Sequence, residues 1–215
     1  MTILIFANGD IEDYAWVQPY LDEATAVVAA DGGAGHVLAA GARPDLIIGD
    51  LDSFPADRRE ELETNGVEFV SYPRAKDETD LELALLHAVR AYEEPLLVLG
   101  GLGGRLDQIF ANVLLLMHPD LRYHSIRFVT EHQRIWLAHD ETEIRGERGD
   151  TLSLIPLGGD VHVAATAGLQ WELADEILSF GPARGLSNVM TAAVARVAVK
   201  SGHLLCVYTE QGWGR

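Results

Sequence analysis

Two aspartates, Asp50 and Asp52, stand two residues apart directly after the apolar run Leu46-Ile47-Ile48-Gly49. In extended backbone, residues i and i+2 point to the same side, so both carboxylates would face one spot. Two like charges that close disfavour each other unless a cation lies between them or one of them takes a proton. The pattern therefore allows two interpretations: a metal-binding pair, or a polar turn built from Asp and Ser as turn and cap formers.

Further aspartates follow other apolar runs or precede a helical one. Asp31 comes directly after AVVAA, and the segment RAKDETD supplies Asp77 and Asp80, three residues apart at an expected helix start and so on one face. Helix capping is the alternative explanation for this last pair. Carboxylate oxygens suit Mg²⁺, which prefers one or two protein carboxylates together with phosphate oxygens and water.

A glycine-rich segment, Gly100–Gln108, follows the apolar run LLVLG and precedes the helical run IFANVLLLM. Its glycines let the backbone approach a ligand closely, and the start of the following helix favours an anion. The segment matches neither GxGxxG nor GxxxxGK, which excludes the Rossmann and Walker-type motifs. A tight turn without a ligand is the alternative. Arg105 and Asp107 favour phosphate handling, since arginine can fork onto phosphate oxygens and a neighbouring acid can bind metal or orient a hydroxyl.

The first part of the chain, from Met1 to about Thr130, alternates short β-rich runs with segments of helical spacing. The β-rich runs are ILIFA, AVVAA, LIIG, VEFVSY, LLVLG and IRFVT, and the best helix is DETDLELALLHAVRAY. Repeated β-α units predict a mainly parallel sheet covered on both faces, with ligands at the carboxyl ends of its strands. We expect an α/β domain over residues 1–137 that binds nucleotide and Mg²⁺.

After about Ala138 the pattern changes to short alternating or β-branched runs broken by Gly, Pro and Asp. These runs are TLSLIPLGG, VHVAATAGL, VARVAVK and HLLCVYT. They predict an antiparallel β-sandwich or small barrel over residues 138–215, with the boundary near Leu137–Glu143.

Composition excludes several classes of partner. The chain has 16 Lys and Arg against 33 Asp and Glu, a formal charge of −17, which repels nucleic acid and anionic membranes. The histidines are scattered without an HExxH pair, so zinc chemistry is not expected. The single cysteine, Cys206, the lack of a basic segment before the first apolar run, and the lack of a membrane-length apolar stretch predict a cytoplasmic protein.

Five blocks, taken in order along the chain, resemble the thiamine pyrophosphokinase family. They are ADGGAGHVL, PDLIIGDLDSF, KDETDLELAL, GGLGGRLDQIFANV and TAGLQWELADEILSFGPARGLSN. The resemblance covers both halves of the chain. It implies an α/β domain followed by a β-sandwich, a homodimer with the acceptor site shared across the interface, and transfer of pyrophosphate from ATP to the hydroxyl of thiamine, giving thiamine diphosphate and AMP.

The resemblance also assigns roles to residues. It implies Mg²⁺ ligation by Asp50, Asp52 and Asp77, and catalytic roles for Asp31, Asp77, Asp80 and Asp107. The residues expected to bind ATP are Lys76, Thr79, Gly103, Gly104, Arg105 and Gln108. Those expected to bind thiamine are Trp171, Ser187 and Asn188.

Physical chemistry supports these roles but leaves alternatives. An acidic cleft attracts the cationic thiazolium of thiamine, and Trp171 could stack on its rings, although a core aromatic is the alternative for this tryptophan. Val189 departs from the polar residue that relatives often carry. Asp107, Asp80 or no dedicated base could take the hydroxyl proton. A pterin or other alcohol acceptor, and a non-catalytic sensor of nucleotide or thiamine diphosphate, are the alternative functions.

Overall fold

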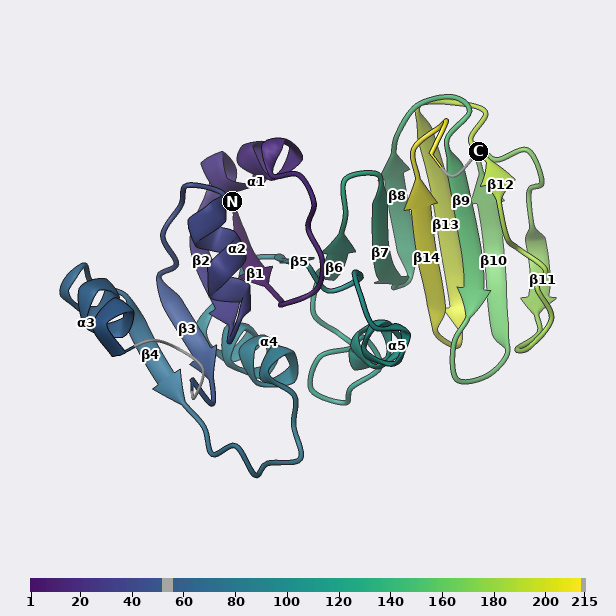
Figure 1. Ribbon diagram of the computed structural model, residues 1–215. Coiled ribbons are helices and arrows are strands. Elements are labelled where there is room, and N and C mark those ends of the chain that lie inside the picture. The colour runs from purple at the N-terminus through teal and green to yellow at the C-terminus, as the bar shows by residue number, and fades with distance from the viewer. Residues whose placement is uncertain (52–55, 214–215) are drawn as a thin grey trace. The chain divides into compact units, whose positions relative to one another are not determined.

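The protein consists of two compact units, Met1–Glu131 and His132–Arg215. The structure, a computed structural model shown in Figure 1, describes residues 1–51 and 56–213. Asp52 and Ser53, from the motif that follows the third apolar run, lie outside the described residues. Among the residues described, no helix combines the length and the apolar character needed to cross a membrane.

Parallel strands form the sheet of the first unit, as the β-α pattern predicts. They are β1 (Thr2–Phe6), β2 (Ala24–Ala30), β3 (Leu46–Gly49), β4 (Glu68–Ser71), β5 (Leu96–Leu99) and β6 (Ile126–Val129). Their order across the sheet is β6-β5-β1-β2-β3-β4, and each neighbouring pair is parallel. The carboxyl ends of these strands therefore lie along one edge.

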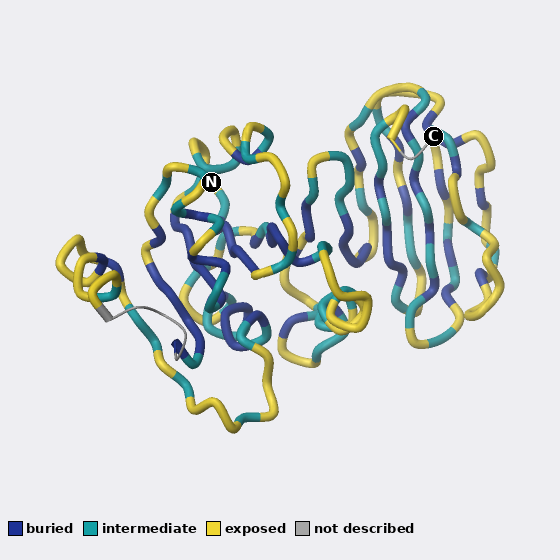
Figure 2. The backbone as a smooth tube through the Cα atoms, in the orientation of Figure 1, coloured by how far each residue is buried: buried dark blue, intermediate teal, exposed yellow. Residues whose placement is uncertain are grey.

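The helices of this unit are η1 (Ala15–Val17), α1 (Gln18–Glu23), α2 (Gly33–Ala39), α3 (Ala56–Thr64), α4 (Asp80–Ala91) and α5 (Leu106–Leu115). Helix α5 has no buried residue, and it contacts α4. One core cluster joins Val17, α2 and α3 to Leu4 and Phe6 of β1. Helix α4 packs against β1, β2 and β3, but its buried residues are not in that cluster. Helices thus cover both faces, which explains why the central strands appear dark blue along their length in Figure 2.

The start of α4 differs from the sequence expectation. Thr79 is the N-cap, and its Oγ1 accepts a hydrogen bond from the Glu82 N–H at 3.1 Å. This bond is one half of a capping box, and it places the cap two residues after Asp77. Asp77 therefore precedes the helix, and the helical spacing that was expected to put Asp77 and Asp80 on one face does not apply.

Antiparallel strands form both layers of the second unit. They are β7 (Gln133–Ala138), β8 (Glu141–Arg145), β9 (Thr151–Pro156), β10 (Val161–Ala167), β11 (Ala174–Leu178), β12 (Asn188–Val189), β13 (Val194–Ser201) and β14 (Leu204–Thr209). One layer has the order β12-β9-β14-β7 and the other β11-β10-β13-β8. A shared core joins Leu152 and Cys206 of the first layer to Val163 and Val197 of the second, so the unit is a β-sandwich.

The pairing of β7 with β14 explains where the chain divides into two units. Strand β7 pairs with β14 along its whole length, from Gln133↔Thr209 to Ala138↔Leu204. The boundary expected after Leu137 falls inside β7, whereas the structure divides the chain after Glu131. A strand that is hydrogen-bonded along its length to β14 belongs to the sandwich.

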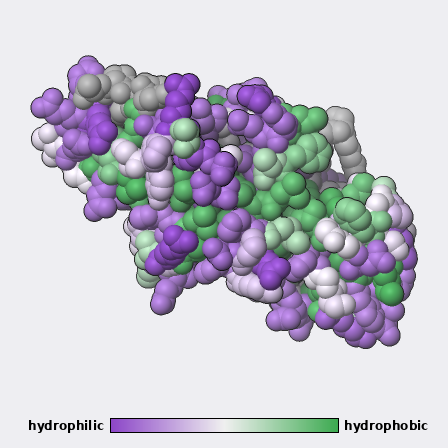
Figure 3. Space-filling model, turned by 90° about the horizontal axis from the view of Figure 1, so that it is seen from below, coloured by the Kyte–Doolittle hydropathy of each residue, from purple (hydrophilic) through white to green (hydrophobic). Residues whose placement is uncertain are grey.

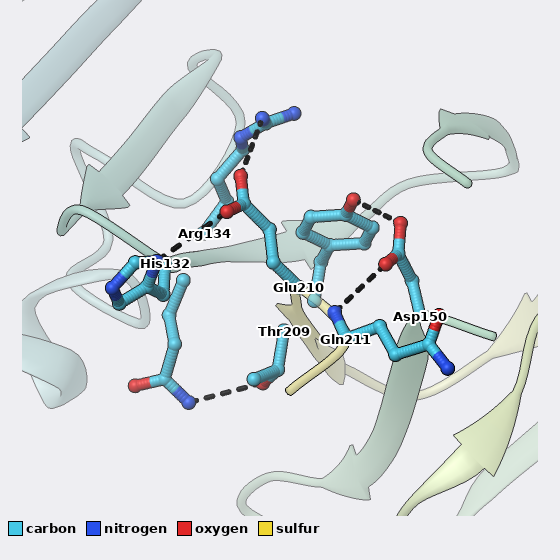
Figure 4. Close-up of polar contacts among 8 residues, drawn as sticks. His132, Arg134, Asp150, Thr209, Glu210 and Gln211 are labelled. Atoms are coloured by element: carbon cyan, nitrogen blue, oxygen red, sulfur yellow. Dashed lines mark hydrogen bonds and ion pairs between the residues drawn. The ribbon is translucent and has the colours of Figure 1, made fainter. Parts of the chain in front are cut away.

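A buried carboxylate anchors the segment that follows β14. Asp150 is 3% exposed and accepts hydrogen bonds from the Tyr208 hydroxyl, the Glu147 N–H at 2.5 Å and the Gln211 N–H at 2.9 Å. Figure 4 shows Asp150 and Gln211 joined in this way, beside the pair of His132 and Glu210. Burial alone would raise the pKa of Asp150, but these hydrogen bonds outweigh it and hold the pKa below its ordinary value.

Candidate functional site

The carboxyl edge of the parallel sheet brings two predicted acids to neighbouring strand ends. Asp31 follows β2, its N–H donates to the Ile48 carbonyl of β3 at 2.7 Å, and Asp50 follows β3. Gly49 makes this approach possible, because a Cβ there would lie 2.8 Å from the Asp31 Cβ. The φ of Asp31 is 44°, in the left-handed region that Asp tolerates better than most residues. Such backbone geometry is common at functional sites.

A cavity of about 180 Å³ opens at this edge and gathers part of the predicted set. Its walls come from the turns after β1, β2 and β5 and from the first turns of α4 and α5. The lining residues are Ala7, Asn8, Gly9, Ala30, Asp31, Thr79, Asp80, Leu81, Gly100, Gly103, Gln108, Ala111 and Asn112. Of the predicted site residues, Asp31, Thr79, Asp80, Gly103 and Gln108 thus lie together.

The other predicted residues of the first unit lie outside this lining. Lys76 is 9% exposed at its side chain, and its Nζ lies 2.8 Å from the Asp80 Oδ1. Lys76 therefore neutralises and holds a carboxylate that lines the cavity. Asp50 is half-buried, and Asp77 is exposed. Gly104, with a φ of 86°, follows Gly103 in the glycine-rich turn.

Arg105 and Asp107 form an exposed pair of their own. The Arg105 Nη2 lies 2.6 Å from the Asp107 Oδ2, and Arg105 is the N-cap residue of α5. The hydrogen bond from Arg105 lowers the pKa of Asp107. A carboxylate with a lowered pKa is a weaker proton acceptor, so this arrangement suits Asp107 to holding Arg105 more than to general-base catalysis.

The turn after β1 was missed by the sequence reasoning. Asn8 and Gly9 line the cavity, and a Cβ at Gly9 would lie 2.3 Å from the Gly100 carbonyl oxygen. Asn112, which was also missed, donates from Nδ2 to the Gly101 carbonyl at 2.8 Å. The Gly9 N–H also donates to the Gly100 carbonyl at 2.8 Å, so Gly9 joins the turns after β1 and β5, while Asn112 joins α5 to the turn after β5. The sequence ANGD, directly after an apolar run, indicates a turn at this place. It does not show which other turn packs against it.

The donor set at this edge fits a magnesium ion. Asp31 and Asp50 follow adjacent strands and offer hard carboxylate oxygens. Among the described residues, no three Asp, Glu, His or Cys side chains cluster closely enough to hold a metal unaided. Mg²⁺ commonly needs only one or two protein carboxylates, because phosphate and water supply the remaining ligands. Asp52, the third predicted ligand of this motif, lies outside the described residues.

The second unit carries a larger, more apolar cavity of about 580 Å³. It is lined by Leu154, Gln170, Trp171, Glu172, Leu173, Leu178, Arg184, Gly185, Leu186 and Asn188. The Trp171 side chain is 57% exposed, so it belongs to the wall of this cavity and not to the sandwich core. A flat aromatic ring in an apolar cavity can bind a planar or cationic ring.

Asn188 holds Trp171 in place. Its Oδ1 accepts from the Trp171 N–H at 3.0 Å, and its Nδ2 donates to the Trp171 carbonyl at 2.7 Å. Asn188 is 5% exposed, so these bonds use a buried carboxamide. Ser187, with a φ of 55°, is exposed, and its N–H donates to the Ser153 Oγ at 2.9 Å. Trp171 and Asn188 thus line the cavity together, whereas Ser187 is not among its lining residues, and Asn188 bonds to the backbone of Trp171.

Comparison with known proteins decides which family these two sites belong to. A family model described as the catalytic domain of thiamin pyrophosphokinase matches residues 17–130, just over half of the 215-residue chain. The chain belongs to the thiamin pyrophosphokinase family. A second model, the vitamin B1 binding domain of thiamin pyrophosphokinase, matches residues 139–204. The family identified from the sequence blocks is thus confirmed.

Relatives within the thiamin pyrophosphokinase family match nearly the whole chain. The thiamine pyrophosphokinase of Bacillus subtilis is 27% identical over 96% of this chain and 97% of its own length. A crystal structure of thiamine pyrophosphokinase from that organism has a TM-score of 0.86 at 26% identity, covering 98% of this chain and 99% of the other. The crystal structure of the enzyme from Geobacillus thermodenitrificans has a TM-score of 0.84, also at 26% identity, and covers 99% of each chain.

These matches confirm the fold class, α/β followed by antiparallel β, and make the chain an enzyme of the kinase type of transferase. They favour the thiamin pyrophosphokinase reading over a pterin pyrophosphokinase and over a non-catalytic sensor.

Proposed function

We propose that this chain transfers a pyrophosphoryl group from ATP to the hydroxyl of thiamine, giving thiamine diphosphate and AMP. The observation that carries the proposal is the match of both family models, in order, to the two units of the chain. Each unit contributes a cavity of the corresponding chemical character, polar in the first and aromatic in the second.

The reaction needs the thiamine hydroxyl oxygen to attack the β-phosphorus of ATP. The bond between that phosphorus and the α,β-bridging oxygen breaks, AMP leaves, and the hydroxyl proton passes to an acceptor. We assign Asp80 as this acceptor, because its carboxylate lines the polar cavity where the triphosphate is proposed to bind. Asp107 is not among the residues that line this cavity, and it is paired with Arg105.

Charge neutralisation is the other requirement of phosphoryl transfer. We assign Asp31 and Asp50 to a Mg²⁺ site, with Asp52 and Asp77 as the further acids that the family resemblance implies. When bound, Mg²⁺ supplies positive charge to the triphosphate oxygens. Thr79, Gly103 and Gln108 line the same cavity and offer a hydroxyl, a backbone N–H and a carboxamide to the nucleotide. We place Gly104 and Arg105 beside them at the start of α5.

Thiamine is proposed to bind the cavity of the second unit. Its thiazolium carries a permanent positive charge, which favours the face of Trp171 and the carboxylate of Glu172 at the same wall. Asn188 fixes the backbone of Trp171, and Ser187 lies next to it in the chain. The excess of acidic residues over the whole chain adds a field that attracts this substrate.

We also propose a homodimer in which the two copies share the acceptor site. Helix α5 supports an interface, because Leu106, Phe110 and Leu114 are 67%, 62% and 54% exposed and recur every fourth residue on one face. Figure 3 shows that hydrophobic side chains gather among hydrophilic ones on one face of the molecule. A Phe110→Glu substitution should convert a dimer to a monomer in sedimentation velocity, while Tyr123→Glu, at another exposed aromatic, should not.

One assay tests the activity directly. Purified protein is incubated with Mg²⁺, ATP and thiamine, and the nucleotide product is separated by chromatography. AMP formed in step with thiamine diphosphate supports the proposal, and ADP with thiamine monophosphate contradicts it. The cytoplasm is the proposed location, supported by the burial of the single cysteine, Cys206, in the sandwich core.

A further inference from the structure

We propose that Asn8 binds the polyphosphate chain of ATP, as a substrate-binding residue in addition to those predicted from the sequence motifs. The inference rests on the proposed function of the first unit. Asn8 comes two residues after β1, a strand that pairs with β5 on one side and β2 on the other. It lines the same polar cavity as Asp31 and Gln108.

The side chain of Asn8 occupies the space that a side chain at position 32 would need, where the chain has glycine. A Cβ on Gly32 would lie 2.5 Å from the Cγ and Nδ2 of Asn8 and 2.6 Å from its Oδ1. The backbone of Gly32 has a φ of −59° and a ψ of −14°, which any residue adopts. The lack of a side chain at position 32 therefore gives the Asn8 carboxamide room beside Gly32, and a Cβ there would displace it.

The carboxamide has hydrogen-bonding capacity to spare. Within the part of the chain that the structure describes, no hydrogen bond is made by the Asn8 side chain. A carboxamide offers two donors and an acceptor, and here they stand at an open cavity next to the two glycine-rich turns. Asn8 is exposed, so its carboxamide can exchange water for a ligand that enters the cavity.

The shape and charge of the cavity select phosphate as the group bound. At about 180 Å³, with walls of glycine backbone and small side chains such as Ala7, Ala30 and Ala111, the cavity has no aromatic face among its lining residues for a base. Its acids, Asp31 and Asp80, repel an anion. Asn8 offers N–H donors without adding charge, and a hydrogen bond to a charged oxygen is stronger than one between neutral groups.

Steady-state kinetics on the full-length enzyme test the inference. Asn8→Ala should lower kcat/KM for ATP by roughly 10- to 100-fold, the loss of one hydrogen bond to a charged group, and leave the thiamine KM at saturating ATP unchanged. Asn8→Asp, which keeps the size of the side chain but adds a negative charge, should lower kcat/KM for ATP further. An Asn8→Ala enzyme with kcat/KM for ATP near the wild-type value, or with only the thiamine KM raised, would overturn the inference. Wild-type protein that forms no AMP would instead contradict the proposed function.

A double-mutant cycle with Gly32 separates this role from a general loss of structure. Gly32→Ala should push the Asn8 carboxamide aside and reproduce most of the loss of Asn8→Ala, but it should cost little when Asn8→Ala is already present. Gly35→Ala is the matched control, because the same helix α2 contains Gly35 and a Cβ there meets nothing within 4 Å. Equal losses from Gly32→Ala in both backgrounds would show that Asn8 is not the group it displaces, and would refute the inference.

Discussion

The Asn188→Ala substitution gives a quantitative test of how the second unit positions its aromatic wall. The change removes the acceptor of the Trp171 and Val189 N–H groups, both at 3.0 Å, and the donor to the Trp171 carbonyl at 2.7 Å. At about 1 kcal/mol of net stability for each bond, and with water able to reach the exposed Trp171, we expect a loss of roughly 2–3 kcal/mol in the free energy of unfolding. The freed Trp171 should also lose its stacking on thiamine, worth about 0.5–2 kcal/mol, which corresponds to a roughly 2- to 30-fold rise in the thiamine KM.

Urea unfolding followed by tryptophan fluorescence measures the first effect, and initial rates at varied thiamine measure the second. The ATP KM should stay at its wild-type value. The decisive measurement is the Asn188→Ala, Trp171→Ala double variant. If Asn188 acts through Trp171, the double variant should have the same thiamine KM as Trp171→Ala alone. A double variant whose thiamine KM is the product of the two single effects would show that Asn188 touches thiamine directly, and the positioning argument would be wrong.

Asn188→Asp is the matched control for this reasoning. It keeps the size of the side chain and the oxygen that accepts from the two N–H groups. It replaces the donor to the Trp171 carbonyl with a second oxygen, so two acceptors face each other where the 2.7 Å bond was. We expect a rise in the thiamine KM at neutral pH that is at least as large as that of Asn188→Ala. Part of the lost stability should return at acid pH, where the protonated carboxyl can donate again.

Three further predictions follow from the same coordinates. Asp31→Asn should leave the circular dichroism spectrum unchanged and lower kcat by orders of magnitude, because it removes a carboxylate at the phosphate-binding edge; an unchanged kcat would exclude a metal-binding role. Trp171→Ala should raise the thiamine KM and spare the ATP KM, and the reverse result would place thiamine elsewhere. Tyr208→Phe should cost roughly 1.5–3 kcal/mol of unfolding free energy at pH 7, because it removes a hydrogen bond to the ionised Asp150. Since the fold lowers the pKa of Asp150 from 3.8, the carboxylate stabilises the protein above that value, and the cost of Tyr208→Phe should shrink as pH falls below it; a constant cost down to pH 2 would contradict this.

Much of the first unit was predictable because most of its strands are buried on both faces, the edge strand β4 being the exception. Continuous apolar runs such as Leu46–Gly49 mark such strands, and each was located within a residue or two. Strands β7, β8, β11 and β12 of the second unit match none of the runs named from the sequence, and β8 and β11 show why. β8 and β11 each carry two acids and a single buried residue, Ile144 or Leu178, and five residues of that composition resemble a polar loop. Their partners, β13 and β10, decide that they are strands.

Some site residues could be predicted from their neighbours in the sequence, and others depend on contacts between distant parts of the chain. Asp31 and Asp50 could be predicted as site residues because each follows an apolar run directly. The contact between Asn8 and Gly32 joins the ends of β1 and β2, and only the parallel pairing of those strands brings the two residues together. The start of α4 was predicted two residues too early, at Asp77 instead of the N-cap Thr79. Both Asp77 and Thr79 are good N-cap residues, and Glu82 favours Thr79.

Strand β14 gives the second unit an unusual sensitivity to truncation. It pairs with β7 along one side and with β9 along the other, and it follows both of them late in the chain. A chain that stops shortly before Leu204 lacks β14. Strands β7 and β9 would then each expose the backbone N–H and C=O groups that β14 pairs with. Exposed edges of this kind recruit strands from neighbouring molecules. Late nonsense mutations are thus expected to produce aggregates, not a shortened enzyme that keeps its first unit in working order.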